Sequence, residues 1–122
     1  MSGVGDAVDL AGKLAQIDGH WSPRIVARYN DNKVVVAQVL GKFVWHSHLD
    51  TDDLFLVLDG RLTIDLRDRS VELGPGQLFV VPRGVEHRPR ADVETHVLLV
   101  EPEGTPNTGD STEREPAPEI EL

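Results

Sequence analysis

Three histidines and one aspartate in this chain have the spacing of a metal site. His46 and His48 are separated by one residue, so on a strand both imidazoles point to the same face, with backbone positions about 6.6 Å apart. Asp53 follows five residues after His48, and His87 follows a Pro/Gly turn at 82–84. Because the chain has no cysteine, a metal would have to be held by histidine, aspartate or glutamate. These four residues form a plausible ligand set.

Imidazole and carboxylate ligands suit Mn, Fe, Ni, Co, Cu or Zn and discriminate poorly among them. An octahedral ion with four protein ligands would keep two positions for water, substrate or dioxygen, whereas a tetrahedral zinc would be closed and structural. Other chemistries find less support. No serine lies in a GxSxG elbow, and the glycines at 74 and 76 precede no helical pattern that could cradle a phosphate.

The dipeptide Asp59-Gly60 lies between two apolar runs and predicts a two-residue β-hairpin turn. In that register the residues that share a face with Asp53 are all apolar: Phe55, Val57, Leu62, Ile64 and Leu66. An isolated carboxylate is unfavourable on an interior face, so Asp53 should have a cationic partner there. The opposite face contains Leu54, Leu56 and Leu58, and we expect it to be covered as well.

From Arg24 onward the hydrophobic pattern has a period of two and predicts an all-β sandwich or barrel. Strands are expected at 24–29, 33–40, 42–48, 53–58, 61–67, 77–82, 86–90 and 95–101. Before them, an apolar stripe predicts one short helix that starts after a cap at Asp6 and ends near Gly19. We therefore divide the chain into a helical extension (1–22), a barrel (23–103) and a tail (104–122).

The net charge of −9 argues against nucleic acid and anionic membranes as partners, since both need clustered Lys and Arg. No membrane span is predicted, and the first residues lack the basic region of a signal peptide, so a cytoplasmic protein is expected. The tail is acidic, rich in proline and poor in apolar residues, which predicts a mobile segment. The alternative is that Ile120 and Leu122 dock on a partner subunit.

Two stretches of the chain resemble the two sequence motifs of the cupin family. GKFVWHSHLDTDDLFLVLDG, from Gly41 to Gly60, resembles the first motif, with its HxH pair, a carboxylate and a closing glycine. GQLFVVPRGVEH, from Gly76 to His87, resembles the second. The resemblance implies a small jelly-roll β-barrel in which His46, His48, Asp53 and His87 bind one divalent transition metal such as Mn, Fe, Ni or Zn.

The chain departs from the family pattern at two positions. The carboxylate is usually glutamate, and Asp53 is shorter by one methylene, so it could act directly or through water. Asp52 is the neighbouring candidate, but its side chain should point to the other face. The family often has an asparagine four places after the last histidine, where this chain has Ala91, which puts a polar pocket contact in doubt.

Small single-domain cupins, often described as mannose-6-phosphate-isomerase-like, include isomerases, dioxygenases and proteins without known activity. The resemblance implies a metalloenzyme that acts on a small oxygen-rich metabolite, with the ion as Lewis acid. The alternatives are a non-catalytic barrel that binds or senses a small molecule and a structural metal site. No catalytic base is evident on the ligand face. His20, His96, Arg88 and Arg90 are interpreted as packing or surface residues, and a homodimer is expected.

Overall fold

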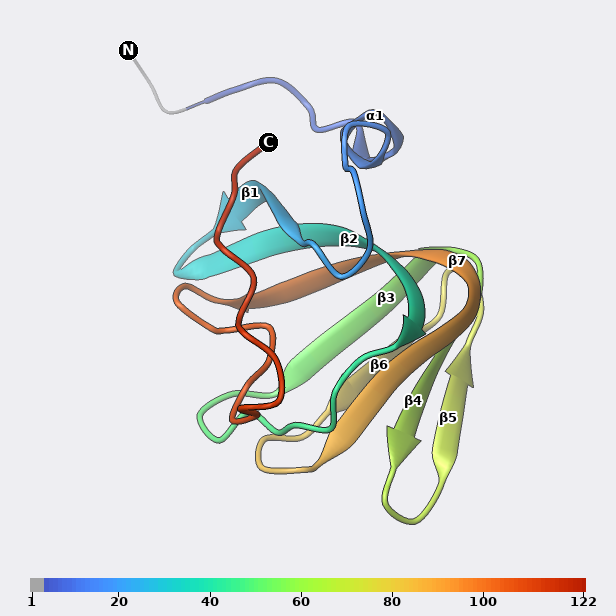
Figure 1. The fold of residues 1–122 in the computed structure, drawn as a ribbon. Coiled ribbons are helices and arrows are strands. Elements are labelled where there is room, and N and C mark those ends of the chain that lie inside the picture. The colour runs from blue at the N-terminus through green and yellow to red at the C-terminus, as the bar shows by residue number, and fades with distance from the viewer. Residues whose placement is uncertain (1–3) are drawn as a thin grey trace.

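The computed structural model describes residues 4–122, and residues 1–3 of the expected helical extension lie outside the described part. The elements along the chain are α1 (Leu10–Leu14), β1 (Arg24–Tyr29), β2 (Asn32–Lys42), β3 (Asp53–Asp59), β4 (Leu62–Leu66), β5 (Ser70–Leu73), β6 (Leu78–Val81) and β7 (His87–Pro102). The architecture is the predicted all-β barrel with a short N-terminal helix (Figure 1). None of the helical segments described has the length and apolarity to cross a membrane.

All strand pairs are antiparallel, and the strands follow the order β1-β2-β7-β3-β6, with β4 paired to β7 and β5. The strands enclose one apolar core, whose members include Val39, Phe55, Val57, Ile64 and Val97. A second, smaller cluster lies on the outer face of the sheet, where α1 packs on β2. Both faces of the central strands are therefore partly covered, as expected.

The longest strand, β7, replaces two predicted strands, 86–90 and 95–101, with a single run of sixteen residues. The predicted strand at 42–48 is wrong: β2 ends at Lys42, and only an isolated bridge at His46 follows. The short strand β5 was not predicted. The helix starts at Leu10 instead of directly after Asp6, with Asp9 at the cap position, because the β-branched Val8 is a weak helix former.

The predicted hairpin at Asp59-Gly60 is wrong, because β3 and β4 both pair with β7 and not with each other. The Thr95 hydroxyl of β7 bonds both backbone groups of Arg61, and a Cβ on Gly60 would lie 2.5 Å from that oxygen. The connection thus crosses β7 closely and needs glycine there. The prediction that alternate residues of β3 and β4 share one face is still correct, because both strands direct these residues into the same core.

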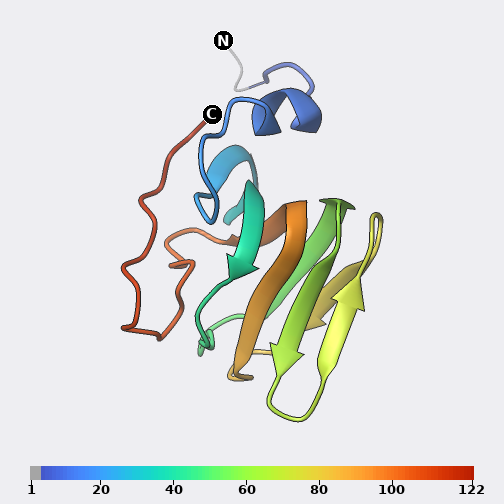
Figure 2. The ribbon, with the colours of Figure 1, turned by 45° about the vertical axis from the view of Figure 1, so that its right-hand side comes forward.

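The C-terminal segment (residues 104–122) differs from its prediction as a mobile tail. It runs along one side of the barrel and ends near α1 (Figure 2). Its last residues form a parallel bridge with β1, and Leu122 packs on the outer apolar cluster. Composition predicted too little apolar burial to order this segment, but its contacts are mainly hydrogen bonds and ion pairs, which composition does not reveal.

Candidate metal centre

Three segments of the chain bring the predicted ligands together. The backbone N–H of His46 donates to the carbonyl of His87 at 3.0 Å, and the N–H of His87 donates back to His46 at 2.9 Å. Nearby, the N–H of Gly84 donates to the carbonyl of His48 at 2.8 Å. The HxH segment is thus fixed beside the start of β7 without forming a regular strand, and Asp53 enters from the first position of β3.

The four predicted side chains form one buried group, named here the His-Asp cluster: His46, His48, Asp53 and His87. Each offers a ligand atom, and these atoms all lie within 4.8 Å of one another. Oδ2 of Asp53 lies 3.0 Å from Nε2 of His87 and 3.3 Å from Nε2 of His48. A set of three imidazoles and one carboxylate in this arrangement could hold a metal ion.

The hydrogen bonds of the ring nitrogens test whether a cation fits this cluster. Nδ1 of His46 lies 2.9 Å from the carbonyl of Val44, and Nδ1 of His87 lies 2.9 Å from the carbonyl of Val85. A carbonyl only accepts, so each Nδ1 carries a proton, and Nε2 of a neutral ring then presents a lone pair. Nε2 of His87 lies 3.0 Å from a carboxylate oxygen of Asp53. A ring nitrogen and a carboxylate oxygen at this distance share a proton or bind a common cation, so the donor atoms of the cluster fit a metal ion.

Burial and charge set the protonation of the cluster. Burial alone would raise the pKa of Asp53, but hydrogen bonds from His48 and His87 lower it to about 2. Burial, together with the neighbouring His87, lowers the pKa of His46 to about 4. At neutral pH the aspartate is therefore charged and His46 is neutral, which are the forms that bind a metal.

Three members of the His-Asp cluster, His46, His48 and Asp53, line a cavity of about 60 Å³ inside the barrel. Most of its wall is apolar, and Glu101 and Asn107 add polar groups to it. Glu101 is buried, and its Oε1 lies 3.5 Å from Nζ of the buried Lys33. Burial, with the nearby charge of Asp53, raises the pKa of Glu101 to about 7. Sequence reasoning missed this acid, although Glu101 continues the inward alternation of Val97 and Leu99 on β7.

The remaining candidates lie away from the cluster. Asp52 is exposed and accepts a hydrogen bond from the backbone N–H of Arg83 at 2.9 Å, as its opposite strand parity predicts. His20 lies 3.4 Å from Glu94 at the surface, and His96 is half-buried on β7. Arg88 and Arg90 face outward, where both bind Asp65.

Comparisons with known proteins agree with this architecture. The family model described as "Cupin domain" matches residues 33–101. The uncharacterized protein YdbB of Bacillus subtilis (strain 168) is 33% identical over 102 residues, which cover 83% of this chain and 88% of YdbB. The crystal structure of a cupin-2 domain containing protein from Shewanella frigidimarina NCIMB 400 has 41% identity and a TM-score of 0.78, and the match covers 79% of this chain and 94% of that one.

A larger protein shares the fold at lower identity. Hydroquinone 1,2-dioxygenase from Sphingomonas sp. TTNP3 matches with a TM-score of 0.72 and 21% identity, over 80% of this chain and 32% of the dioxygenase chain. At that identity the likeness concerns the barrel alone. The family match covers more than half of the chain, and the barrel, its paired motifs and its buried histidines agree with it, so this chain belongs to the cupin family.

Proposed function

We propose that this cupin is a metal-dependent enzyme that acts on a small oxygen-rich metabolite. Its ligands for one divalent transition metal (Mn, Fe, Ni or Zn) are the four residues of the His-Asp cluster. The observation that carries the proposal is the buried group of three imidazoles and one carboxylate, whose ligand atoms all lie within 4.8 Å of one another. A bound ion would supply Lewis-acid chemistry toward carbonyl, carboxylate or hydroxyl oxygens.

Glu101 is the residue proposed to transfer protons. Isomerisation of a hydroxy-carbonyl compound needs a group that both accepts and returns a proton, and dioxygenation of a hydroxylated substrate needs one that accepts it. With a pKa of about 7, Glu101 is present in both forms at neutral pH. Glu101 is buried beside a mostly apolar wall, and a low local dielectric strengthens electrostatic interactions with a ligand. The reaction class is therefore proposed as isomerase or dioxygenase type.

The metal assignment is tested by elemental analysis of the purified protein after metal is offered. About one transition metal per chain is expected in the wild type, and none in the His46→Ala/His48→Ala double variant. The matched control is His20→Ala/His96→Ala, which removes two histidines outside the cluster and should keep the metal. A wild type that stays empty, or a loss that is equal in both double variants, would contradict the proposal.

A second candidate is a barrel that binds or senses a small molecule without reaction. The predominantly apolar wall favours it, because such a cavity retains ligands without offering many reactive groups. Turnover of oxygen-rich metabolites by the metal-loaded protein, abolished in Glu101→Gln, supports the enzyme. Retention of an unchanged ligand supports the binding barrel, and unfolding on metal removal would indicate a structural site.

We further propose that the protein forms a homodimer. The outer face of β3 and the edge strand β6 contains half-buried Leu54 and Leu56 beside Leu78 and Val80, which are 59% and 39% exposed. A second copy would cover these apolar side chains. Light scattering after size exclusion should give twice the mass of the 13.4 kDa chain, and a monomer at micromolar concentration would contradict this part of the proposal.

A further inference from the structure

The C-terminal segment is fastened to the residue between the two histidines of the HxH pair. The backbone N–H and the hydroxyl of Ser47 donate to the two carboxylate oxygens of Asp110, at 2.7 and 2.8 Å. The backbone N–H of Asp110 donates back to the carbonyl of Ser47 at 3.0 Å. These three hydrogen bonds are named here the Ser47–Asp110 clasp. All the polar groups of Ser47 are thus held by one residue that lies 63 positions away in the chain.

The segment also packs tightly against the cluster next to the clasp. A Cβ on Gly109 would lie 2.3 Å from the carbonyl oxygen of Ser47 and 3.0 Å from Cδ2 of His46, so only glycine fits there. Thr108 is fully buried, and Asn107 reaches the cavity wall. The segment therefore contacts the His-Asp cluster through Gly109 and contributes Asn107 to the lining of the cavity.

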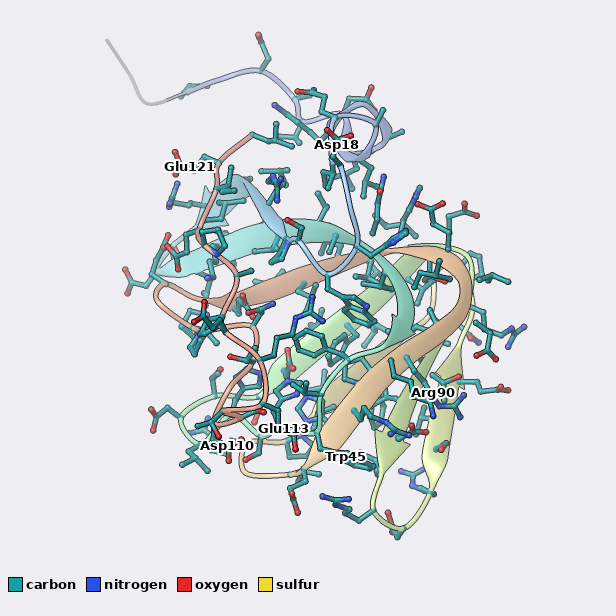
Figure 3. All side chains as sticks on the ribbon, in the orientation of Figure 1. Asp18, Trp45, Arg90, Asp110, Glu113 and Glu121 are labelled. Atoms are coloured by element: carbon teal, nitrogen blue, oxygen red, sulfur yellow. The ribbon has the colours of Figure 1, made fainter. Side chains whose placement is uncertain are left out.

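Two further anchors hold the segment along its length. The buried Nζ of Lys33 donates to the carbonyl of Thr105 and to Glu119, at 3.1 and 2.9 Å. Near the end of the chain, Glu121 pairs with Ile25 of β1. Figure 3 shows Asp110 at one end of the barrel and Glu121 at the other. The clasp is thus one contact of a segment that is ordered on both sides of it.

We propose that Asp110 is a positioning residue for the metal centre, an inference that rests on the proposed metal-binding function. His46 and His48 are joined covalently to either side of Ser47. A backbone that is held in place at Ser47 therefore limits the directions in which both imidazoles can point. Groups that orient metal ligands in this way change metal affinity without touching the ion. Linkage requires the reciprocal effect: a metal that binds better when the segment is docked must hold the segment more firmly in place.

The test compares four variants by cobalt(II) affinity, measured against a competing chelator, and by the visible spectrum of the bound cobalt. Asp110→Ala removes both acceptors and should weaken cobalt binding about tenfold and shift the spectrum. Asp110→Asn keeps an acceptor for the Ser47 N–H and a donor for its hydroxyl, so it should restore both readouts to near the wild-type values. The matched control is Glu113→Ala, which removes the same charge from an exposed residue of the same segment.

Equal affinities and spectra in Asp110→Ala and Glu113→Ala would overturn the inference while leaving the proposed function intact. A wild type that binds no cobalt would overturn both. Hydrogen exchange of residues 104–122 adds a readout on the segment itself: cobalt should slow exchange there about tenfold in the wild type and have no such effect in Asp110→Ala. Ser47→Ala, which removes only the hydroxyl bond, should change each readout in the same direction by less.

Discussion

Two aspartates on strands that follow one another in the chain, β3 and β4, have similar pKa values and very different surroundings. Asp53 lies in the barrel interior and contacts two histidines. Asp65 lies on the outer face of β4, where it accepts hydrogen bonds from Ser70, Arg88 and Arg90. Burial would raise both pKa values, and in each case the partners lower it to about 2. A lowered pKa therefore does not distinguish the candidate metal centre from the surface cluster.

The residues that bind each aspartate distinguish the two groups. The arginines beside Asp65 keep their protons at every accessible pH, so that group is a fixed set of opposite charges. The histidines beside Asp53 can lose theirs, so the interior group can exchange a proton for a metal ion. Adjacent residues of β7, His87 and Arg88, supply the two environments from opposite faces of one strand.

The largest expected difference between the two aspartates is in metal affinity. Asp53→Asn removes the only charged ligand of the His-Asp cluster and should weaken cobalt(II) binding more than about 100-fold, beyond the usual effect of outer-shell groups. Asp65→Asn makes the same chemical change on the outer face and should leave affinity unchanged. Chelator competition measures both. Equal losses would show that the distinction drawn from their partners is wrong.

An intermediate effect, on the free energy of unfolding, is expected from Glu101, the interior acid whose pKa is raised and not lowered. Its folded pKa of about 7 exceeds its ordinary value, so the folded state binds the extra proton and the free energy of unfolding falls as pH rises from about 4.5 to 7. In the metal-free protein, Glu101→Gln should therefore be more stable than the wild type by about 3 kcal/mol at pH 8, and the gain should shrink toward pH 4.5. Urea unfolding across this range measures it, and a gain independent of pH would contradict the assignment.

The smallest effect is expected from the outer face. Asp65→Asn should lower the free energy of unfolding by about 1 kcal/mol at pH 7, because the pair is only partly buried. Its folded pKa of about 2 lies below the ordinary value near 4, so this contribution is present above pH 4 and lost as pH falls from 4 to 2. Urea unfolding of metal-free protein at pH 7 and at pH 3 should show a smaller difference at the lower pH. A difference that grows on acidification would contradict the proposed ion cluster.

The amino-acid sequence predicts the cluster better than the strand pairing around it. Alternation along a strand places Asp53 on the interior face whichever strand lies beside it, so its position is correct although the Asp59-Gly60 hairpin is not. The pairing of β3 with β7 depends on residues some forty positions apart, for which one sequence contains no local signal. The Ser47–Asp110 clasp is a polar contact over 63 positions, and composition alone therefore gave the wrong expectation for residues 104–122.

Side chains along β7 point alternately into and out of the barrel, and this alternation limits the insertions and deletions that the gene can tolerate. Arg88 and Arg90 face outward along this strand, while His87, Val97 and Glu101 face the interior. A single codon inserted between Val97 and Glu101, where β7 pairs with β2 without a register shift, would reverse the facing of everything on one side of it and separate Glu101 from His87. We expect related genes to vary in length at the turn between β4 and β5, residues 67–69, while this part of β7 changes by substitution alone.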